Sequence, residues 1–261
     1  MTTETRQVVI EEAGGAVWLR LNRPARHNAL IPELVAELEA ALNHAAEAKP
    51  VALVLTGNGA SFSTGGDIAG FLAHAGSREE LLGYAEKLVG GLHAVVLKLL
   101  CFPAPVLAAV NGPVTGGATG LVLAADMTAM AEHSFIQPYY SSVGFAPDGG
   151  WTALLPERIG TAKTLQIQYL NERVTAAEAR ALGLVSCVCP YPELKAVVEG
   201  WLNGLAAGSA STHAVTRTNV WDAARLDIVR TRLDQEKARF LERVVQPDTL
   251  AGMTAFLQRR A

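Results

Sequence analysis

The chain has 261 residues, of which half are apolar and 18% are charged, and its formal net charge is −3. This balance excludes a disordered, coiled-coil or collagen-like chain as the main architecture, and the lack of a basic tract argues against a nucleic-acid partner. Its three cysteines are an odd number that does not make a disulfide framework, so we expect a reduced, cytoplasmic protein.

The first half of the chain predicts strands that alternate with helices. The polar segment Met1–Gln7 lacks the apolar core of a signal peptide. Val8–Glu11 and Ala16–Leu21 alternate apolar and polar residues, which predicts a hairpin. The further elements expected here are a helix from Pro32 to about Ala48, a strand at Val51–Leu55, a helix from Ser77 to about Leu100, a strand at Val106–Val110, a helix at Gly116–Ala125 and a strand at Met127–Ala131. This alternation favours parallel pairing of the strands.

The second half of the chain is mainly helical in pattern. The expected elements are a helix at Thr161–Leu170, a helix capped by Thr175 and Glu178 and closed by Gly183, a short strand at Val185–Val188, and helices at Leu194–Ala207, Ser211–Arg225, Ile228–Val245 and Thr249–Arg259. We therefore expect an α/β core over residues 1–190 and a helical C-terminal region over residues 191–261.

The sharpest signal in the composition is the segment Leu99–Pro156, where 58 residues carry only three charges, all of them acidic. A segment this apolar is buried or lines a pocket. Although Leu99–Ala125 is long enough to span a bilayer, its prolines and glycines break it too often for a membrane helix. Asp126 and Glu132 close predicted elements and are expected to reach solvent, whereas Asp148 stands among aromatic residues.

Asp148 has two interpretations at this point. Burial raises the pKa of a carboxyl group, as a proton-transfer group that works near neutral pH requires. However, Pro147–Gly150 is also an ordinary turn signal, in which the aspartate side chain bonds the following amides.

Two glycine-rich junctions, Phe62–Asp67 and Asn111–Gly117, each follow a predicted buried strand. Glycine lets the backbone approach a ligand closely, and two exposed N–H groups can stabilise a developing oxyanion. The alternative is that both junctions are plain turns between a strand and a helix. The histidines show no zinc-binding spacing, so we expect no metal.

A series of short motifs runs in order along nearly the whole chain, from about Val8 to Arg259. The motifs are Asn22–Pro24, Asn28–Leu30, Phe62–Asp67, Pro105–Gly112 with Gly116 and Gly117, Thr175–Ala179 with Gly183–Val185, and Gly252–Leu257. Together they resemble the enoyl-CoA hydratase/isomerase (crotonase) superfamily. Each motif alone is weak, but the ordered set is specific.

The resemblance implies an α/β fold of the crotonase type, a spiral (superhelix) of ββα units with a helical C-terminal region that assembles homotrimers or hexamers. It implies an acyl-CoA substrate whose thioester oxygen is held in an oxyanion hole by the N–H groups of Gly66 and Gly117. No metal or redox cofactor is expected, because coenzyme A enters only as part of the substrate. The expected partners are therefore the acyl-CoA and further copies of the chain, with no nucleic acid and no membrane.

Two positions depart from the hydratases of the superfamily, which activate water with two glutamates. These positions are Gly120 and Tyr139 here. Glycine transfers no proton, and tyrosine, with a pKa of about 10, is a poor substitute for a carboxylate. Asp148 stands where the aspartate-dependent members, such as dienoyl-CoA isomerases and aryl-CoA dehalogenases, carry an aspartate. Gly144–Gly150 most resembles the 1,2-epoxyphenylacetyl-CoA isomerases.

The resemblance thus implies an acyl-CoA isomerase that shifts a double bond or an epoxide-derived ring system through a thioester enolate, with Asp148 as the catalytic base. The side chains expected to bind substrate are Arg26, Asp67, Tyr139, Tyr140 and Trp151. Two alternatives stay open. Asp148 could instead act as the nucleophile of an aryl- or acyl-CoA dehalogenase or hydrolase, or the chain could be a non-catalytic acyl-CoA-binding protein that has lost its acids.

Overall fold

A six-stranded sheet forms the centre of the computed structural model, which describes residues 6–259. The strands are β1 (Val8–Ala13), β2 (Ala16–Leu21), β3 (Leu53–Gly57), β4 (Val106–Val110), β5 (Val114–Thr115), β6 (Met127–Ala131), β7 (Phe135–Gln137), β8 (Val174–Thr175) and β9 (Cys187–Cys189). The central sheet has the order β1-β2-β3-β4-β6-β9, in which β1 and β2 form an antiparallel hairpin and all other neighbours are parallel. A small second sheet has the order β5-β7-β8.

Helices of very different length surround these sheets. They are α1 (Pro32–Glu47), α2 (Ile68–Ala73), α3 (Arg78–Leu100), α4 (Thr119–Leu123), α5 (Tyr140–Val143), α6 (Leu155–Ile159), α7 (Thr161–Leu170), α8 (Ala176–Ala181), α9 (Leu194–Ala207), α10 (Ala210–Val220), α11 (Ala223–Val244) and α12 (Pro247–Gln258). Short 3₁₀-helices lie at Pro24–Arg26, Gly116–Ala118 and Tyr191–Glu193. None of the helices within residues 6–259 is both long and apolar enough to cross a bilayer.

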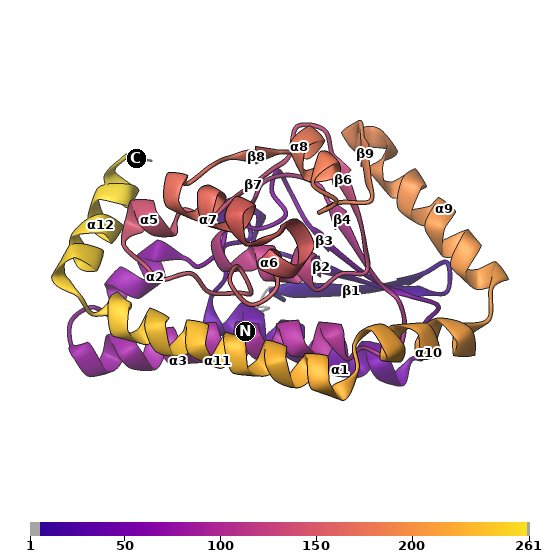
Figure 1. The fold of residues 1–261 in the computed structure, drawn as a ribbon, viewed down its shortest axis with the longest axis horizontal. Helices are drawn as coiled ribbons and strands as arrows, with labels where there is room; N and C mark the ends of the chain where they lie inside the picture. Colours follow the sequence, from indigo (N-terminus) through magenta and orange to yellow (C-terminus); the bar gives the residue numbers. More distant parts are fainter. Residues whose placement is uncertain (1–5, 260–261) are drawn as a thin grey trace, which may run out of the picture.

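Helices cover both faces of the central sheet (Figure 1). On one face Val54 and Leu107 pack with Leu202 of α9. On the other face Leu55 and Ala108 belong to the larger core that includes the buried sides of α1 and α3. Alternate residues of β3 and β4 therefore serve opposite faces, which is why both strands are apolar along most of their length.

The C-terminal helices pack back onto the core. Helix α11 runs along α3, and α12 reaches α2 and α5 (Figure 1). Residues late in the chain are thereby brought to the loops that follow β3 and β4. The predicted boundary at residue 190 stays a prediction, and most of Met1–Gln7 and the last two residues of the C-terminal region lie outside the described residues.

Several elements lie where the sequence predicts them, and others do not. β4, β6, α7 and α9 have the predicted bounds, and Thr175 and Glu178 form the expected capping box of α8. The helix expected at Gly116–Ala125 is instead a 3₁₀ turn followed by α4, and the last strand lies at Cys187–Cys189. The second sheet was not predicted, because its strands of two or three residues leave no periodic pattern. The short helix α2 was not predicted either.

Candidate active site

A cavity of about 650 Å³ opens at the carboxyl ends of β3 and β4. Both glycine-rich junctions line it, through Gly66 after β3 and Gly117 after β4. This is the edge of a parallel sheet at which ligands commonly bind, because the loops that leave the strands gather there.

The backbone N–H groups of Gly66 and Gly117 are not used within the fold. Leu30 and Gly66 form an isolated β-bridge. Its hydrogen bonds run from the Leu30 N–H to the Gly65 oxygen and from the Asp67 N–H to the Leu30 oxygen. The Gly66 N–H takes part in neither of them. Gly117 lies in the first turn of the 3₁₀-helix Gly116–Ala118, where an N–H has no acceptor within the helix. In residues 6–259 neither N–H has a backbone or side-chain acceptor, so both are available to a ligand in the cavity.

Of the three acidic residues in the charge-depleted segment Leu99–Pro156, Asp148 is the one that the structure buries. It is 7% exposed, whereas Asp126 and Glu132 reach solvent as expected. Its side chain lines the cavity beside Gly117. Burial raises the pKa of Asp148 from 3.8 to about 7; a hydrogen bond from Tyr140 opposes this rise and the negative charge of Glu236 adds to it. A carboxyl group with this pKa both takes up and releases protons near neutral pH.

Tyr140 orients the Asp148 carboxylate. Its hydroxyl donates to Oδ1 of Asp148 and lies 3.1 Å from the backbone oxygen of the same residue. Burial, followed by the charge of Asp148, raises the pKa of Tyr140 well above 10, so the hydroxyl keeps its proton. No residue in the described part of the chain donates to the second carboxylate oxygen, Oδ2. The carboxylate is thus fixed through one oxygen, and the other remains open to a ligand.

The loop that carries Asp148 passes very close to the start of α4. A Cβ atom at Gly120 would lie 2.1 Å from the Gly149 carbonyl oxygen, and one at Gly149 would lie 2.3 Å from the Gly117 carbonyl oxygen. Gly149 also has a φ of +62°, which favours glycine. The space that a side chain at position 120 would occupy is therefore filled by the backbone that follows Asp148.

Two buried side chains from distant helices hold this loop. Glu236 of α11 accepts hydrogen bonds from Gly150–Ala153, three of them from amide N–H groups and one from the Thr152 hydroxyl. His93 of α3 accepts the Gly149 N–H at 3.1 Å. Sequence reasoning missed both residues. A signal for Glu236 existed, because it occupies a position on the buried face of an otherwise apolar helical pattern.

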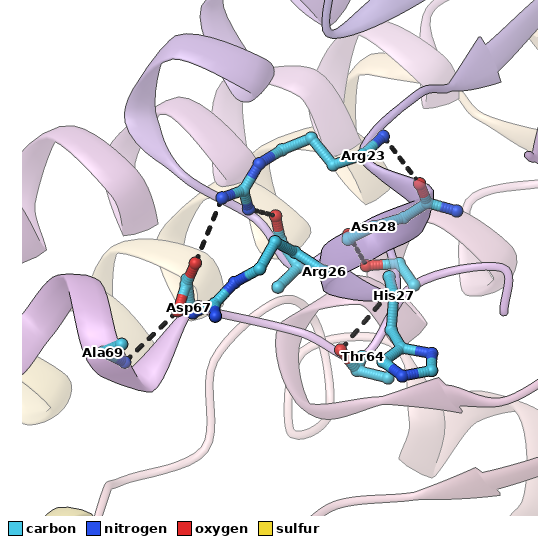
Figure 2. Close-up of polar contacts among 9 residues, drawn as sticks. Arg23, Arg26, His27, Asn28, Thr64, Asp67 and Ala69 are labelled. Carbon is cyan, nitrogen blue, oxygen red and sulfur yellow. Dashed lines mark hydrogen bonds and ion pairs between the residues drawn. The ribbon is translucent and has the colours of Figure 1, made fainter. Parts of the chain in front are cut away.

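Figure 2 shows a charged cluster around Asp67, of which Asp67 and Arg26 line the cavity. Asp67 pairs with Arg23 and Arg26, each at 3.2 Å, and accepts the Ala69 N–H, which caps α2. Arg23 also donates to the backbone oxygen of Ala29. The side chain of Arg26 is 55% exposed. The structure thus brings the predicted residues Arg26 and Asp67 together, but Asp67 is engaged with two guanidinium groups and a helix terminus.

Tyr139 and Trp151, both predicted to bind substrate, differ in position. Tyr139 lines the cavity in a left-handed conformation, with a φ of +62°, and its N–H donates to Asn171 Oδ1. Trp151 is not part of the cavity lining: it is fully buried and its indole N–H donates to the Gly116 oxygen. The prediction for Trp151 is therefore wrong, since the ring supports the turn that presents Gly117 and does not face the cavity.

Aromatic side chains form an apolar part of the cavity lining. Phe71 of α2, Phe145 of the loop after α5, and Phe240 of α11 are packed with ring centroids 4.8–5.8 Å apart. Phe256 and Leu257 of α12 also line the cavity. The site therefore combines two unused N–H groups and one carboxylate of raised pKa with an apolar surface. Within residues 6–259 no group of three or more His, Cys, Asp or Glu side chains could hold a metal ion.

The sequence model of the enoyl-CoA hydratase/isomerase family matches residues 11–261. The chain belongs to this family. It is 28% identical to 4-chlorobenzoyl coenzyme A dehalogenase-2 of Arthrobacter sp over 83% of this chain and 78% of that one. It is 29% identical to enoyl-CoA delta isomerase 2 of Rattus norvegicus over 76% of this chain and 49% of that one. The crystal structure of enoyl-CoA hydratase from Bacillus halodurans matches with a TM-score of 0.89 at 23% identity, over 95% of this chain and 99% of that one, which shows a shared fold.

These comparisons confirm the superfamily and the crotonase fold that the sequence motifs implied. They do not select one reaction, because the names of similar proteins include a hydratase, an isomerase and a dehalogenase. The enoyl-CoA hydratase/isomerase family acts on acyl-CoA thioesters, so the choice among reactions depends on the residues around Asp148.

Gly120→Glu restores the glutamate of the hydratases at this position, but we expect no gain of hydratase activity. A side chain here must displace the Gly149 backbone, and the Asp148 carboxylate with it. The free energy of unfolding should fall by about 1–3 kcal/mol through overpacking. Urea unfolding and an assay of 2-enoyl-CoA hydration measure the two effects. Gly200→Glu on α9 is the control, because a Cβ there meets nothing within 4 Å. A folded Gly120→Glu protein that hydrates 2-enoyl-CoA would show that the Asp148 loop and a glutamate at position 120 are compatible.

Asp148→Asn should stabilise the protein in a pH-dependent way. The folded state raises the pKa of Asp148 from 3.8 to about 7, so folding favours its protonated form. In the wild type, protonated Asp148 therefore stabilises the folded state fully below about pH 4. This stabilisation is lost as the pH rises through about 7. The variant should therefore be more stable than the wild type at about pH 8, by up to about 4 kcal/mol, and equally stable near pH 4.

Urea unfolding of both proteins across this pH range provides the measurement. Asp234→Asn, an exposed change on α11, should show no such pH-dependent difference. A stability difference for Asp148→Asn that stays constant with pH would show that the carboxyl group ionises normally in the folded protein.

Proposed function

We propose that the protein is an acyl-CoA isomerase in which Asp148 moves a proton along a substrate held by the N–H groups of Gly66 and Gly117. The observation that carries this proposal is the position of a buried carboxylate, with a pKa of about 7 and one open oxygen, beside one of two unused amide N–H groups. We assign the protein to the aspartate-dependent isomerases of the family, a group that includes the 1,2-epoxyphenylacetyl-CoA isomerases.

The chemistry follows from these groups. The two N–H groups bind the thioester oxygen and stabilise the negative charge that develops on it. Oδ2 of ionised Asp148 removes a proton from the α-carbon of a 3-enoyl-CoA, which leaves a dienolate. The same carboxyl group then returns that proton to the γ-carbon, which gives the 2-enoyl-CoA and regenerates the carboxylate. One base performs both steps, so the second acid of a hydratase is not required.

The remaining residues of the cavity have binding roles in this proposal. Tyr140 keeps Asp148 oriented, Tyr139 and the phenylalanine side chains of the lining contact the acyl group, and the exposed Arg26 is placed to meet an anionic part of coenzyme A. An epoxide-derived ring system attached to the thioester would form the same enolate and is a second substrate class for this site.

We also propose that the protein assembles as a homotrimer or a hexamer in the cytoplasm. Helix α7 exposes Leu165, Tyr169 and Leu170, which are 40%, 72% and 68% exposed. A cluster of large apolar side chains on one short helix is typical of a surface that a partner covers.

A second candidate is a nucleophilic role for Asp148. In dehalogenation Oδ2 displaces halide from the aryl carbon and forms an aryl ester, whereas in thioester hydrolysis it displaces the coenzyme A thiolate and forms an anhydride. Water then cleaves either intermediate and regenerates the carboxylate. The similarity to a 4-chlorobenzoyl coenzyme A dehalogenase favours this role, as does the absence of a hydrogen bond to Oδ2 among the described residues. The raised pKa of Asp148 favours the proton-transfer route, because a nucleophilic carboxylate must be ionised whereas a base must also hold the proton.

Incubation with 3-enoyl-CoA in D2O tests the isomerase. The wild type should form 2-enoyl-CoA, and Asp148→Asn should lose at least about 100-fold in kcat, since a general base contributes roughly 10²–10⁴-fold. The exposed change Asp234→Asn should keep full activity. An Asp148→Asn protein as active as the wild type would remove Asp148 from this role.

Turnover of 4-chlorobenzoyl-CoA in H2¹⁸O separates the second candidate from the first. Over successive turnovers, an ester intermediate places ¹⁸O in the Asp148 carboxyl group, whereas proton transfer does not. A protein that binds CoA thioesters in calorimetry but converts none of these substrates would support the non-catalytic alternative.

A further inference from the structure

Glu236 is a buried carboxylate that lies behind the loop of Asp148 and does not line the cavity. Its Oε1 accepts the Thr152 N–H and hydroxyl, both at 2.7 Å, and the Ala153 N–H at 2.9 Å. Its Oε2 accepts the Gly150 N–H at 2.8 Å. A protonated carboxyl group would need an acceptor for its own proton, and this environment supplies four donors. Burial raises the pKa of Glu236, and the hydrogen bonds from Gly150, Thr152 and Ala153 oppose this rise. The set of four donors favours the ionised carboxylate.

The neighbouring titratable groups come from three helices. Tyr140 of α5 faces Asp148 and keeps its proton. His93 of α3 has Nε2 3.7 Å from Oε2 of Glu236, but burial and then Lys237 of α11 lower the pKa of His93 to about 4, so the ring is neutral at pH 7. In the described part of the chain no Lys or Arg pairs with Glu236. The negative charge of Glu236 therefore has no paired cation in the interior.

We propose that Glu236 is a positioning residue for the base: its carboxylate fixes the segment Gly149–Ala153 against α4 and maintains a second negative charge behind Asp148. This inference rests on the proposed role of Asp148. Glu236 acts only through that residue, because it is 4% exposed and absent from the cavity lining. A like charge nearby disfavours ionisation, so Glu236 adds to the effect of burial and helps to keep Asp148 a proton carrier at neutral pH.

Glu236→Gln tests this role. The amide keeps Oε1, which can still accept three of the four donors, but it removes the charge and turns an NH2 group toward the Gly150 N–H. We expect the midpoint of Asp148 ionisation to fall by about one pH unit. The readout is the carboxyl carbon-13 NMR signal of Asp148, assigned by its loss in Asp148→Asn, which requires no turnover. In the isomerase assay kcat should fall while KM changes by less than about twofold.

The control is Glu242→Gln, an exposed change on the same helix that removes a charge paired with Arg239. It should leave the Asp148 midpoint unchanged. A folded Glu236→Gln protein with the wild-type midpoint would overturn the proposal.

If Glu236→Gln does not fold, the carboxyl carbon-13 NMR signal of Glu236 in the wild type provides the test. This signal should report an ionised group throughout the titration of Asp148, and a protonated Glu236 in that range would overturn the proposal. The proposed function fails separately. If Asp148→Asn is fully active while Glu236→Gln still shifts the Asp148 midpoint, the isomerase mechanism is wrong and the positioning of the carboxyl group stands.

Discussion

The site depends on a backbone contact between glycines. Gly149 lies against Gly117 and Gly120 so closely that a Cβ atom at any of these three positions would fall within 3 Å of another group. This contact seats the Asp148 carboxylate beside the N–H group of Gly117. It also fills the space that a side chain at position 120 would need. Gly120 is thus a packing requirement of the loop and is not in itself a sign of lost activity.

A buried loop of this kind has backbone N–H groups that need acceptors in the interior. They find them in Glu236 and His93, which come from α11 and α3, the two long helices that pack along each other. The C-terminal helices also add Phe240 and Phe256 to the cavity wall. The site is therefore completed by residues from widely separated parts of the sequence, and the helical region contributes to its geometry as well as to the overall fold.

The features that the sequence locates well are those whose information is local. The apolar runs of β4 and β6 and the glycines at positions 66 and 117 can be recognised within a few residues. Asp148 was singled out as an acidic residue in a segment without Lys or Arg, although the local sequence also predicts a turn there. Its catalytic role was implied by the family resemblance and stays a prediction. Glu236 was missed because its partners lie more than 80 residues away in the chain. Trp151 was misassigned because an aromatic residue next to a site residue can face either the cavity or the core, and its indole found an acceptor in the Gly116 oxygen.

The proposed proton transfer places opposing demands on Asp148. An oxygen that removes a proton from one carbon and returns it to another must hold that proton only briefly, so its two protonation states need similar free energies at working pH. Burial and the charge of Glu236 raise the free energy of the ionised form, and the Tyr140 hydrogen bond lowers it again. Because Tyr140 keeps its own proton, the carboxyl group stays in one orientation in both states. Removing any one of these three influences would shift the balance between the two protonation states and so slow one of the two steps.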